Sequence, residues 1–260
     1  MICVLTKKMQ NKIENLPNIQ EILKKNNVKI NKALGQNFIF DLNITDKIVK
    51  KSDQFASTII EIGSGPGSLT RSILKNKSAV VYAIDKDIQS KAMLADLKMI
   101  YKDRLNIIID DALYYPIWEL GDTPRQIIAN LPYNIGTKML VMWLKNIHKF
   151  DLLTLMFQKE VADRIIAKPG SKNYGRLSIL TNWLTQSSKL FDIPSNAFIP
   201  RPKVNSTVIQ LKPLSKPIFD VSFESLEKLT HLAFSQKRKM LKTSLKSING
   251  EKTLEELNIS

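Results

Sequence analysis

The residues best suited to chemistry are Asn130-Leu131-Pro132-Tyr133, which follow a short apolar run. The Asn130 side-chain oxygen and the Leu131 carbonyl are two acceptors that could bond both hydrogens of an exocyclic amine such as N6 of adenine. Its conjugated lone pair would then be free to attack a methyl donor. Pro132 would rigidify the turn, and Tyr133 offers a ring on which an extruded base can stack. The same residues also fit an ordinary turn with an internal proline and an exposed tyrosine.

A glycine-rich turn, Glu61-Ile62-Gly63-Ser64-Gly65-Pro66-Gly67, follows an earlier apolar run. Glycines let a ligand approach the backbone closely. A dinucleotide fingerprint would need a third glycine at position 68, where the chain has Ser68, so the spacing disfavours NAD. The spacing resembles instead the loop of S-adenosylmethionine-dependent methyltransferases, in which the amino-acid end of the cofactor lies over the glycines. We therefore expect S-adenosyl-L-methionine as the cofactor, with Glu61, Gly63 and Gly65 at its binding site.

Two acidic residues, Asp85 and Asp111, follow the next two apolar runs. Asp85 is placed to accept hydrogen bonds from the two ribose hydroxyls, and Asp111 could accept one from the adenine amino group. Asp87 is a rival for the ribose role, although it lies past the end of its apolar run. Each acid alone could equally be a solvated strand end or a helix N-cap. A glycine loop followed by acids after successive strands is a combination that chance rarely produces.

Short apolar runs alternate with helical segments, which is typical of a parallel sheet of right-handed βαβ units. The expected strands cover residues 58–62, 79–84, 105–109, 126–129 and 152–157, and residues 204–211 are expected to form a late, antiparallel edge strand. Ligands bind at the carboxyl ends of such strands, where the glycines, the acids and Asn130 fall. The predicted fold class is α/β: a Rossmann-like S-adenosylmethionine-dependent methyltransferase sheet with helices on both faces, plus a small C-terminal helical domain.

The domain organisation is predicted from changes in composition and hydrophobic pattern along the chain. Residues 1–29 are expected to be a tail with a short helix, residues 30–212 a methyltransferase domain, and residues 213–260 a small basic helical domain. Two prolines interrupt both helix and sheet in residues 212–217, which therefore look like a linker.

The composition restricts the possible partners. Thirty-nine Lys and Arg against 24 Asp and Glu give a net charge of +15 in 260 residues, which favours nucleic acid over an anionic membrane surface. One cysteine and two histidines cannot form a disulfide framework or a Cys/His metal cage. No apolar run is long enough to span a bilayer. We expect a cytoplasmic monomer with no metal and no membrane partner.

Several motifs together resemble those of the ribosomal RNA adenine dimethylase family, and most closely those of its small-subunit members. Besides the glycine loop, they are Leu34-Gly35-Gln36-Asn37-Phe38, Asn130-Leu131-Pro132-Tyr133-Asn134-Ile135, Gln158-Lys159-Glu160-Val161-Ala162, Tyr174-Gly175-Arg176-Leu177-Ser178, Phe198-Ile199-Pro200-Arg201-Pro202-Lys203-Val204 and Ala233-Phe234-Ser235-Gln236-Lys237-Arg238-Lys239. They are spread through most of the chain, roughly from Leu34 to Leu245.

This resemblance implies N6,N6-dimethylation of two adjacent adenosines in the 3′-terminal hairpin of small-subunit (16S) rRNA, on a maturing subunit during ribosome biogenesis. It also implies that Asn37 and Ile39 line the cofactor and that Phe198 and Tyr133 flank the target base. Asp85 stands where the family usually has Glu, so its carboxylate reaches one methylene less far toward the ribose.

Basic residues in two of these motifs are the candidates for contact with rRNA. Arg201 and Lys203 follow Phe198, and the run Lys237-Arg238-Lys239 lies near the C-terminus. The run could also be a solvated helix face, but the net charge favours a phosphate-binding patch.

Two other functions are compatible with part of this pattern. A large-subunit rRNA methylase that confers antibiotic resistance shares the glycine loop and an asparagine-initiated turn. Residues 198–204 and 236–239 favour the small subunit. A ribosome-assembly or transcription-associated binding protein could keep the fold without catalysis, but the intact Asn130 and Tyr133 argue against it.

Overall fold

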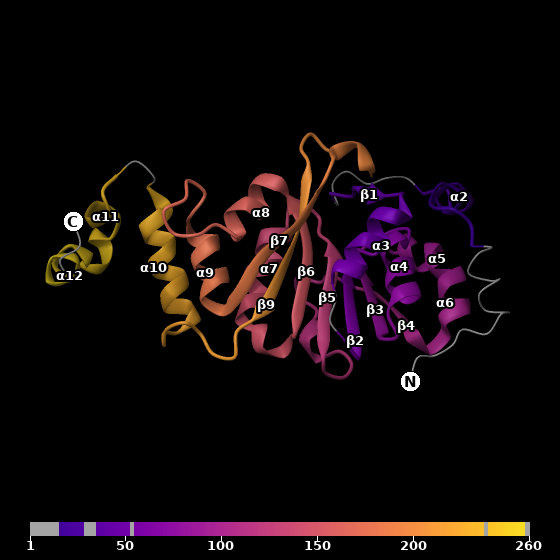
Figure 1. Cartoon of the computed structure of the whole chain (residues 1–260), viewed down its shortest axis with the longest axis horizontal. Coiled ribbons are helices and arrows are strands. Elements are labelled where there is room, and N and C mark those ends of the chain that lie inside the picture. Colours follow the sequence, from indigo (N-terminus) through magenta and orange to yellow (C-terminus); the bar gives the residue numbers. More distant parts are fainter. Residues whose placement is uncertain (1–15, 29–34, 53–54, 237–238, 258–260) are drawn as a thin grey trace.

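The computed structural model of the chain describes residues 16–28, 35–52, 55–236 and 239–257. Its centre is a seven-stranded sheet with the strand order β4-β3-β2-β5-β6-β9-β7, which runs across the middle of Figure 1. The strands are β2 (Thr58–Ile62), β3 (Val80–Asp85), β4 (Leu105–Ile109), β5 (Arg125–Asn130), β6 (Leu152–Gln158), β7 (Thr185–Ile193) and β9 (Ser206–Pro213). Strands β2 to β6 pair in parallel, whereas β9 is antiparallel to both of its neighbours.

The five predicted parallel strands are confirmed, and so is the antiparallel direction of β9. The prediction that β9 lies at the edge is wrong, because β9 is inserted between β6 and β7. The edge strand β7 was not predicted, since its first residues alternate between buried and exposed polar side chains instead of forming an apolar run. An antiparallel strand with one solvated face needs no such run. The expected linker also begins later, because Pro213 still pairs with Thr185 of β7.

Helices cover both faces of the sheet, as predicted. Successive residues of a strand point to opposite faces, so Ile60 and Ile127 belong to one core cluster while their neighbours Ile59 and Ile128 belong to another. The helices of the first cluster are α7 (Gly136–Lys145), α8 (Lys159–Ile165) and α9 (Arg176–Leu184). Those of the second are α3 (Leu42–Lys51), α4 (Ser68–Asn76) and α6 (Ala95–Tyr101), and α5 (Gln89–Met93) precedes α6.

Two small elements from the first part of the chain lie beside this framework. Strand β1 (Phe38–Ile39) pairs antiparallel with β8 (Phe198–Ile199), which joins two segments that are distant in the sequence. The short helix predicted within residues 1–29 is α2 (Ile19–Lys25), which begins with a capping box at Asn18. Its Ile19 and Ile22 pack with Met93 of α5. Residues 1–15 of the predicted tail lie outside the described residues.

The C-terminal helices differ in how they join the sheet domain. They are α10 (Phe223–Ser235), α11 (Leu241–Ser244) and α12 (Gly250–Glu256). Leu226 of α10 belongs to the core cluster of the sheet, and Glu227 pairs with Arg176 of α9 at 2.7 Å. Helix α10 is therefore continuous with the main body, whereas α11 and α12 lie beyond it at one end of the molecule (Figure 1). The remaining short 3₁₀ helices are Lys102–Arg104, Ile117–Glu119, Ile147–Lys149, Ser195–Ala197 and Lys246–Ile248.

Candidate active site

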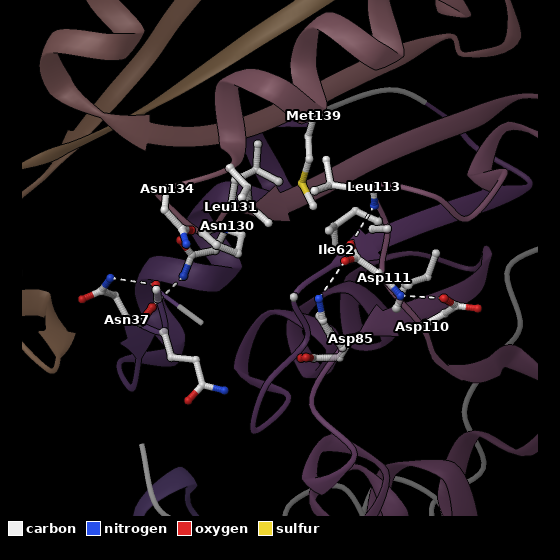
Figure 2. Close-up of a pocket in the computed structure, with 18 of the residues that line it drawn as sticks. Asn37, Ile62, Asp85, Asp110, Asp111, Leu113, Asn130, Leu131, Asn134 and Met139 are labelled. Atoms are coloured by element: carbon white, nitrogen blue, oxygen red, sulfur yellow. Dashed lines mark hydrogen bonds and ion pairs between the residues drawn. The ribbon is translucent and has the colours of Figure 1, made fainter. Parts of the chain in front are cut away.

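A pocket of about 200 Å³ lies at the carboxyl ends of β2, β3, β4 and β5. The predicted residues that line it are Asn37, Gly63, Asp85, Asp111, Asn130 and Leu131. Figure 2 shows Asn37, Asn130 and Asn134 on one side of this pocket and Asp85, Asp110 and Asp111 on the other. The structure thus brings the asparagine turn and the two predicted acids to one cavity, as the positions after successive strands indicated.

The Asn130 amide is held in one orientation. Its Nδ2 donates a hydrogen bond to the backbone carbonyl of Asn37 at 2.9 Å. Among the described residues, none donates a hydrogen bond to Asn130 Oδ1, and no backbone N–H donates to the Leu131 carbonyl. The amide nitrogen is therefore paired, whereas the two oxygens that could accept from an exocyclic amine, Asn130 Oδ1 and the Leu131 carbonyl, stay available.

The glycine loop is shaped by close packing as well as by conformation. Gly65 has a φ of +48°, which L side chains rarely adopt, and a Cβ at this position would lie 2.6 Å from the Phe38 ring. Its backbone N–H donates to Asp85 Oδ2 at 2.7 Å. Gly65 does not itself line the pocket. Its contacts instead fix the loop against β1 and the end of β3.

Asp85, and not its rival Asp87, lines the pocket. The Asp85 carboxylate accepts from the backbone N–H groups of Gly65 and Asp87, and burial raises its pKa. Asp87 is buried beside the pocket, where its carboxylate accepts a hydrogen bond from Gln36 Nε2 at 2.9 Å. Asp87 thus ties the segment before β1 to the end of β3.

Asp111 lies on the same side of the pocket as Asp85 and pairs with a cation that the sequence analysis did not predict. Its Oδ2 pairs with Lys86 Nζ at 2.9 Å, and its Oδ1 accepts from the Leu113 backbone at 3.0 Å. The hydrogen bond from Lys86 lowers the pKa of Asp111. An ionised carboxylate is therefore maintained at this edge of the pocket.

Glu61 and Ile39 line a smaller cavity of about 20 Å³ behind the glycine loop. Glu61 is 1% exposed, and within the described part of the chain its Oε2 has no hydrogen-bond partner; the same holds for the hydroxyls of Ser64 and Ser68. Burial, reinforced by the nearby charge of Asp85, raises the pKa of Glu61 to about 8. The carboxyl is therefore largely protonated at neutral pH.

The two predicted aromatic residues lie outside the pocket. Tyr133 is half-buried, and its hydroxyl lies 2.5 Å from Ser206 Oγ. Phe198 is only 1% exposed and belongs to the core cluster of the second face, where it pairs with Ile39 across β1 and β8. The Phe198 ring faces this core, so its role beside a base stays a prediction.

The predicted RNA-binding residues are not gathered at the pocket. Arg201 and Lys203 are exposed in the turn between β8 and β9, and Arg201 Nε donates to Ser195 Oγ. Lys239 is exposed before α11. Lys237 and Arg238 lie outside the described residues.

Sequence reasoning did not predict several residues of the pocket wall, among them the polar residues Gln36, Lys86, Asp110 and Asn134 and the apolar Met139. Gln36 and Asn134 were inside motifs that had been recognised, so their position was the available signal. Met139 of α7 is 2% exposed and borders the pocket as well.

The described residues lack two further classes of feature. They contain no group of three or more His, Cys, Asp or Glu that could hold a metal ion. No helix among them is both long and apolar enough to cross a membrane.

The hydrogen-bond acceptors that line the pocket fit S-adenosylmethionine. Carboxylates at the ends of β3 and β4 suit hydroxyl and amino groups, and the glycine loop leaves backbone exposed beside Asn130, where a Cβ on Gly63 would lie 3.7 Å from the Asn130 carbonyl oxygen. Together with the mixed sheet and its helices on both faces, this defines the Rossmann-like fold of S-adenosylmethionine-dependent methyltransferases.

Comparison with known proteins identifies the family. The model of the family described as ribosomal RNA adenine dimethylase matches residues 27–260, and the chain belongs to this family. Proteins called ribosomal RNA small subunit methyltransferase A are similar: that of Bartonella bacilliformis is 45% identical over 95% of this chain and 91% of its own. That of Rhodospirillum rubrum is 43% identical over 93% of this chain and 84% of its own.

Two solved structures are similar in fold. A dimethyladenosine transferase from Plasmodium falciparum superposes with a TM-score of 0.69 and 28% identity, over 80% of this chain and 74% of its own. The 23S rRNA methyltransferase ErmE superposes with a TM-score of 0.65 over 86% of this chain and 91% of its own. Its identity of 21% makes it evidence for the fold alone.

Proposed function

We propose that this protein uses S-adenosyl-L-methionine to dimethylate N6 of two adjacent adenosines in the 3′-terminal hairpin of 16S rRNA during ribosome biogenesis. The observation that carries the proposal is the Asn130 amide, whose nitrogen is paired with the Asn37 carbonyl while its oxygen stays available at the pocket. Family membership and the names of the relatives from Bartonella and Rhodospirillum support the small subunit as the target.

The cofactor would be held by the two sides of the pocket. Asp85 would accept from the ribose hydroxyls and Asp111 from the adenine amino group, while Gly63 leaves room for the amino-acid end. Asn37 lines the same pocket, and Ile39 and Glu61 support the loop from the small cavity behind it. When bound, S-adenosylmethionine supplies an electrophilic methyl group on a sulfonium sulfur.

Asn130 and Leu131 would activate the acceptor amine. In the first transfer, accepting both N6 hydrogens, at Asn130 Oδ1 and the Leu131 carbonyl, removes the lone pair from conjugation with the purine ring and aims it at the methyl group. In the second transfer the monomethylated amine has one hydrogen left, which one of these two oxygens accepts. The methylated nitrogen is then a strongly acidic cation that loses its proton to water. No general base is needed, and the pocket-lining residues of the described chain include no histidine.

The partner would be the small ribosomal subunit, so we place the protein in the cytoplasm. The net charge of +15 supports binding to a polyanion, with Arg201, Lys203 and Lys239 exposed for phosphate contacts. One chain supplies both Asn130 and all the residues proposed to hold the cofactor, so we propose that it acts as a monomer.

The test is transfer of tritium from labelled S-adenosylmethionine to small subunits that lack the modification. Wild-type protein is expected to label two adjacent adenosines near the 3′ end, as located by mass spectrometry. Asn130→Ala is expected to lower the rate by about 10²–10³-fold, because it removes one of two acceptors, while the binding of subunits is kept.

Two controls separate this function from the alternatives. Unmodified large subunits serve as the competing substrate, and label there instead of on small subunits would identify a large-subunit methylase. If Asn130→Ala left the cellular phenotype unchanged, the protein would be a binding factor and the proposed catalysis would be wrong.

A further inference from the structure

The hydroxyl of Tyr133 is tied to a residue that is distant in the sequence. It lies 2.5 Å from Ser206 Oγ, and the two residues are 73 positions apart. Tyr133 belongs to the turn after β5, and Ser206 is the first residue of β9. Because β6 separates β5 from β9 in the sheet, this bond links the turn to a strand two places away.

Ser206 is a rigid anchor for this bond. It is fully buried and lies opposite Gln158 of β6 and Ile193 of β7 in the strand register. The residue before it, Asn205, accepts a hydrogen bond from the Lys159 backbone at 2.9 Å and another from the Ser195 backbone at 3.0 Å. The backbone position of Ser206 is thus fixed by two strands and by the bonds that Lys159 and Ser195 donate to Asn205.

Among the described residues, the Tyr133 hydroxyl has no second hydrogen-bond partner. Its turn is closed by backbone bonds from Ile135 and Gly136 to the Pro132 carbonyl, which do not involve the ring. The phenol oxygen lies on the axis of the ring, so a bond at this atom fixes the direction in which the whole side chain points. Burial raises the pKa of Tyr133, which keeps the hydroxyl neutral and able to donate or accept at this bond.

We propose that Ser206 is a positioning residue for methyl transfer: by bonding the Tyr133 hydroxyl, it holds the aromatic ring where the acceptor adenine stacks. This inference rests on the proposed function. It also gives a role to the end of the recognised 198–204 motif, which leads into β9, because that segment places Ser206 beside the turn. The hydroxyl of Tyr133 then bonds Ser206, and the face of its ring stacks on the base.

The test compares Ser206→Ala, Tyr133→Phe and the double variant in transfer to unmodified small subunits. Each single variant loses the same bond and keeps the ring, so each is expected to lower kcat by about tenfold, equivalent to about 1.4 kcal/mol, with the KM for S-adenosylmethionine unchanged. The double variant is expected to be no slower than either single variant. Tyr133→Ala removes the ring as well and is expected to be slower than all three.

Thr207→Val is the matched control. Thr207 is the next residue of β9, is equally buried, and bonds Asp192 Oδ1 at 2.6 Å, away from Tyr133. It is expected to leave kcat unchanged. A second readout is the ionisation of Tyr133, measured as the absorbance titration that Tyr133→Phe removes. The Ser206 bond lowers the pKa of Tyr133, so Ser206→Ala is expected to move this titration to higher pH.

The outcomes separate this inference from the function on which it rests. If the wild-type chain transfers label and Ser206→Ala has wild-type kcat, the inference is overturned and the function stands. Multiplicative losses in the double variant, or equal losses in Thr207→Val, would also overturn it. If the wild-type chain transfers no label to small subunits, the proposed function fails, and the positioning role fails with it.

Discussion

Replacing Glu61 by Gln tests the account of the buried carboxyl behind the glycine loop. Glu61 is 1% exposed, and its Oε2 has no partner among the described residues. Its pKa is raised from 4.5 to about 8, chiefly because burial disfavours the charged form. Gln has nearly the same shape and stays neutral, so the substitution removes the titration without opening a cavity.

The magnitude follows from linkage between protonation and folding. Below the unfolded-state pKa the carboxyl is neutral in both states and has no effect on stability. As the pH rises through 4.5 toward 8, the unfolded chain ionises while the folded protein holds the proton, so the stability of the wild type falls. At about 1.4 kcal/mol for each pH unit, the loss reaches about 3 kcal/mol at pH 7 and at most about 5 kcal/mol above pH 8.

The assay is urea unfolding of wild type and Glu61→Gln between about pH 4.5 and about pH 8.5. The two free energies of unfolding are expected to be similar at the acid end, and the variant is expected to be the more stable by up to about 3 kcal/mol at pH 7. Glu160→Gln, at an exposed position on α8, controls for the loss of a carboxyl. A difference between Glu61→Gln and wild type that stays constant over this range would refute the reasoning.

Two further substitutions test the packing of the glycine loop and the acidic wall of the pocket. Gly65→Ala places a Cβ 2.6 Å from the Phe38 ring at a φ of +48°, whereas Gly170→Ala has a φ of +82° with nothing within 4 Å. Urea unfolding is expected to show that Gly65→Ala loses about 1–3 kcal/mol more stability than Gly170→Ala. Equal losses would contradict the close packing of Gly65 against Phe38. Asp111→Asn removes the charge that pairs with Lys86 and is expected to weaken S-adenosylmethionine binding about tenfold in calorimetry, while Asp110→Asn, one residue earlier in the same wall, is expected to have little effect. The reverse order of these two affinities would transfer the adenine role to Asp110.

The parallel half of the sheet could be predicted from the sequence because its signals are local. A strand that is buried on both faces is mostly apolar, and residues 58–62 and 152–157, which are buried along their whole length, show this directly. The edge strand β7 could not be found in this way. It begins with buried Thr185 and Ser187 between exposed residues, and its place depends on β9, which pairs with it from the other side.

The candidate site, like the sheet, could be predicted from the sequence only in part. The placement of Asp85, Asp111 and Asn130 at one cavity followed from their positions after successive strands, because parallel strands bring their carboxyl ends to one edge. The sequence also favoured Asp85 over Asp87, because Asp87 lies beyond the strand, and of these two acids Asp85 is the one that lines the pocket. It did not show that Lys86 would pair with Asp111, because the spacing of these residues in the sequence does not specify a side-chain contact between the ends of β3 and β4.

Sequence alone therefore determined the fold class, the edge of the sheet that carries the chemistry, and the residue types available there. Only the tertiary structure decided which way those side chains face. The Asn130 amide is oriented by a carbonyl 93 residues away, Tyr133 is held by Ser206, and Phe198 is buried in the core. Strand periodicity is a property of neighbouring residues, whereas these orientations depend on contacts between segments that meet only when the sheet has formed.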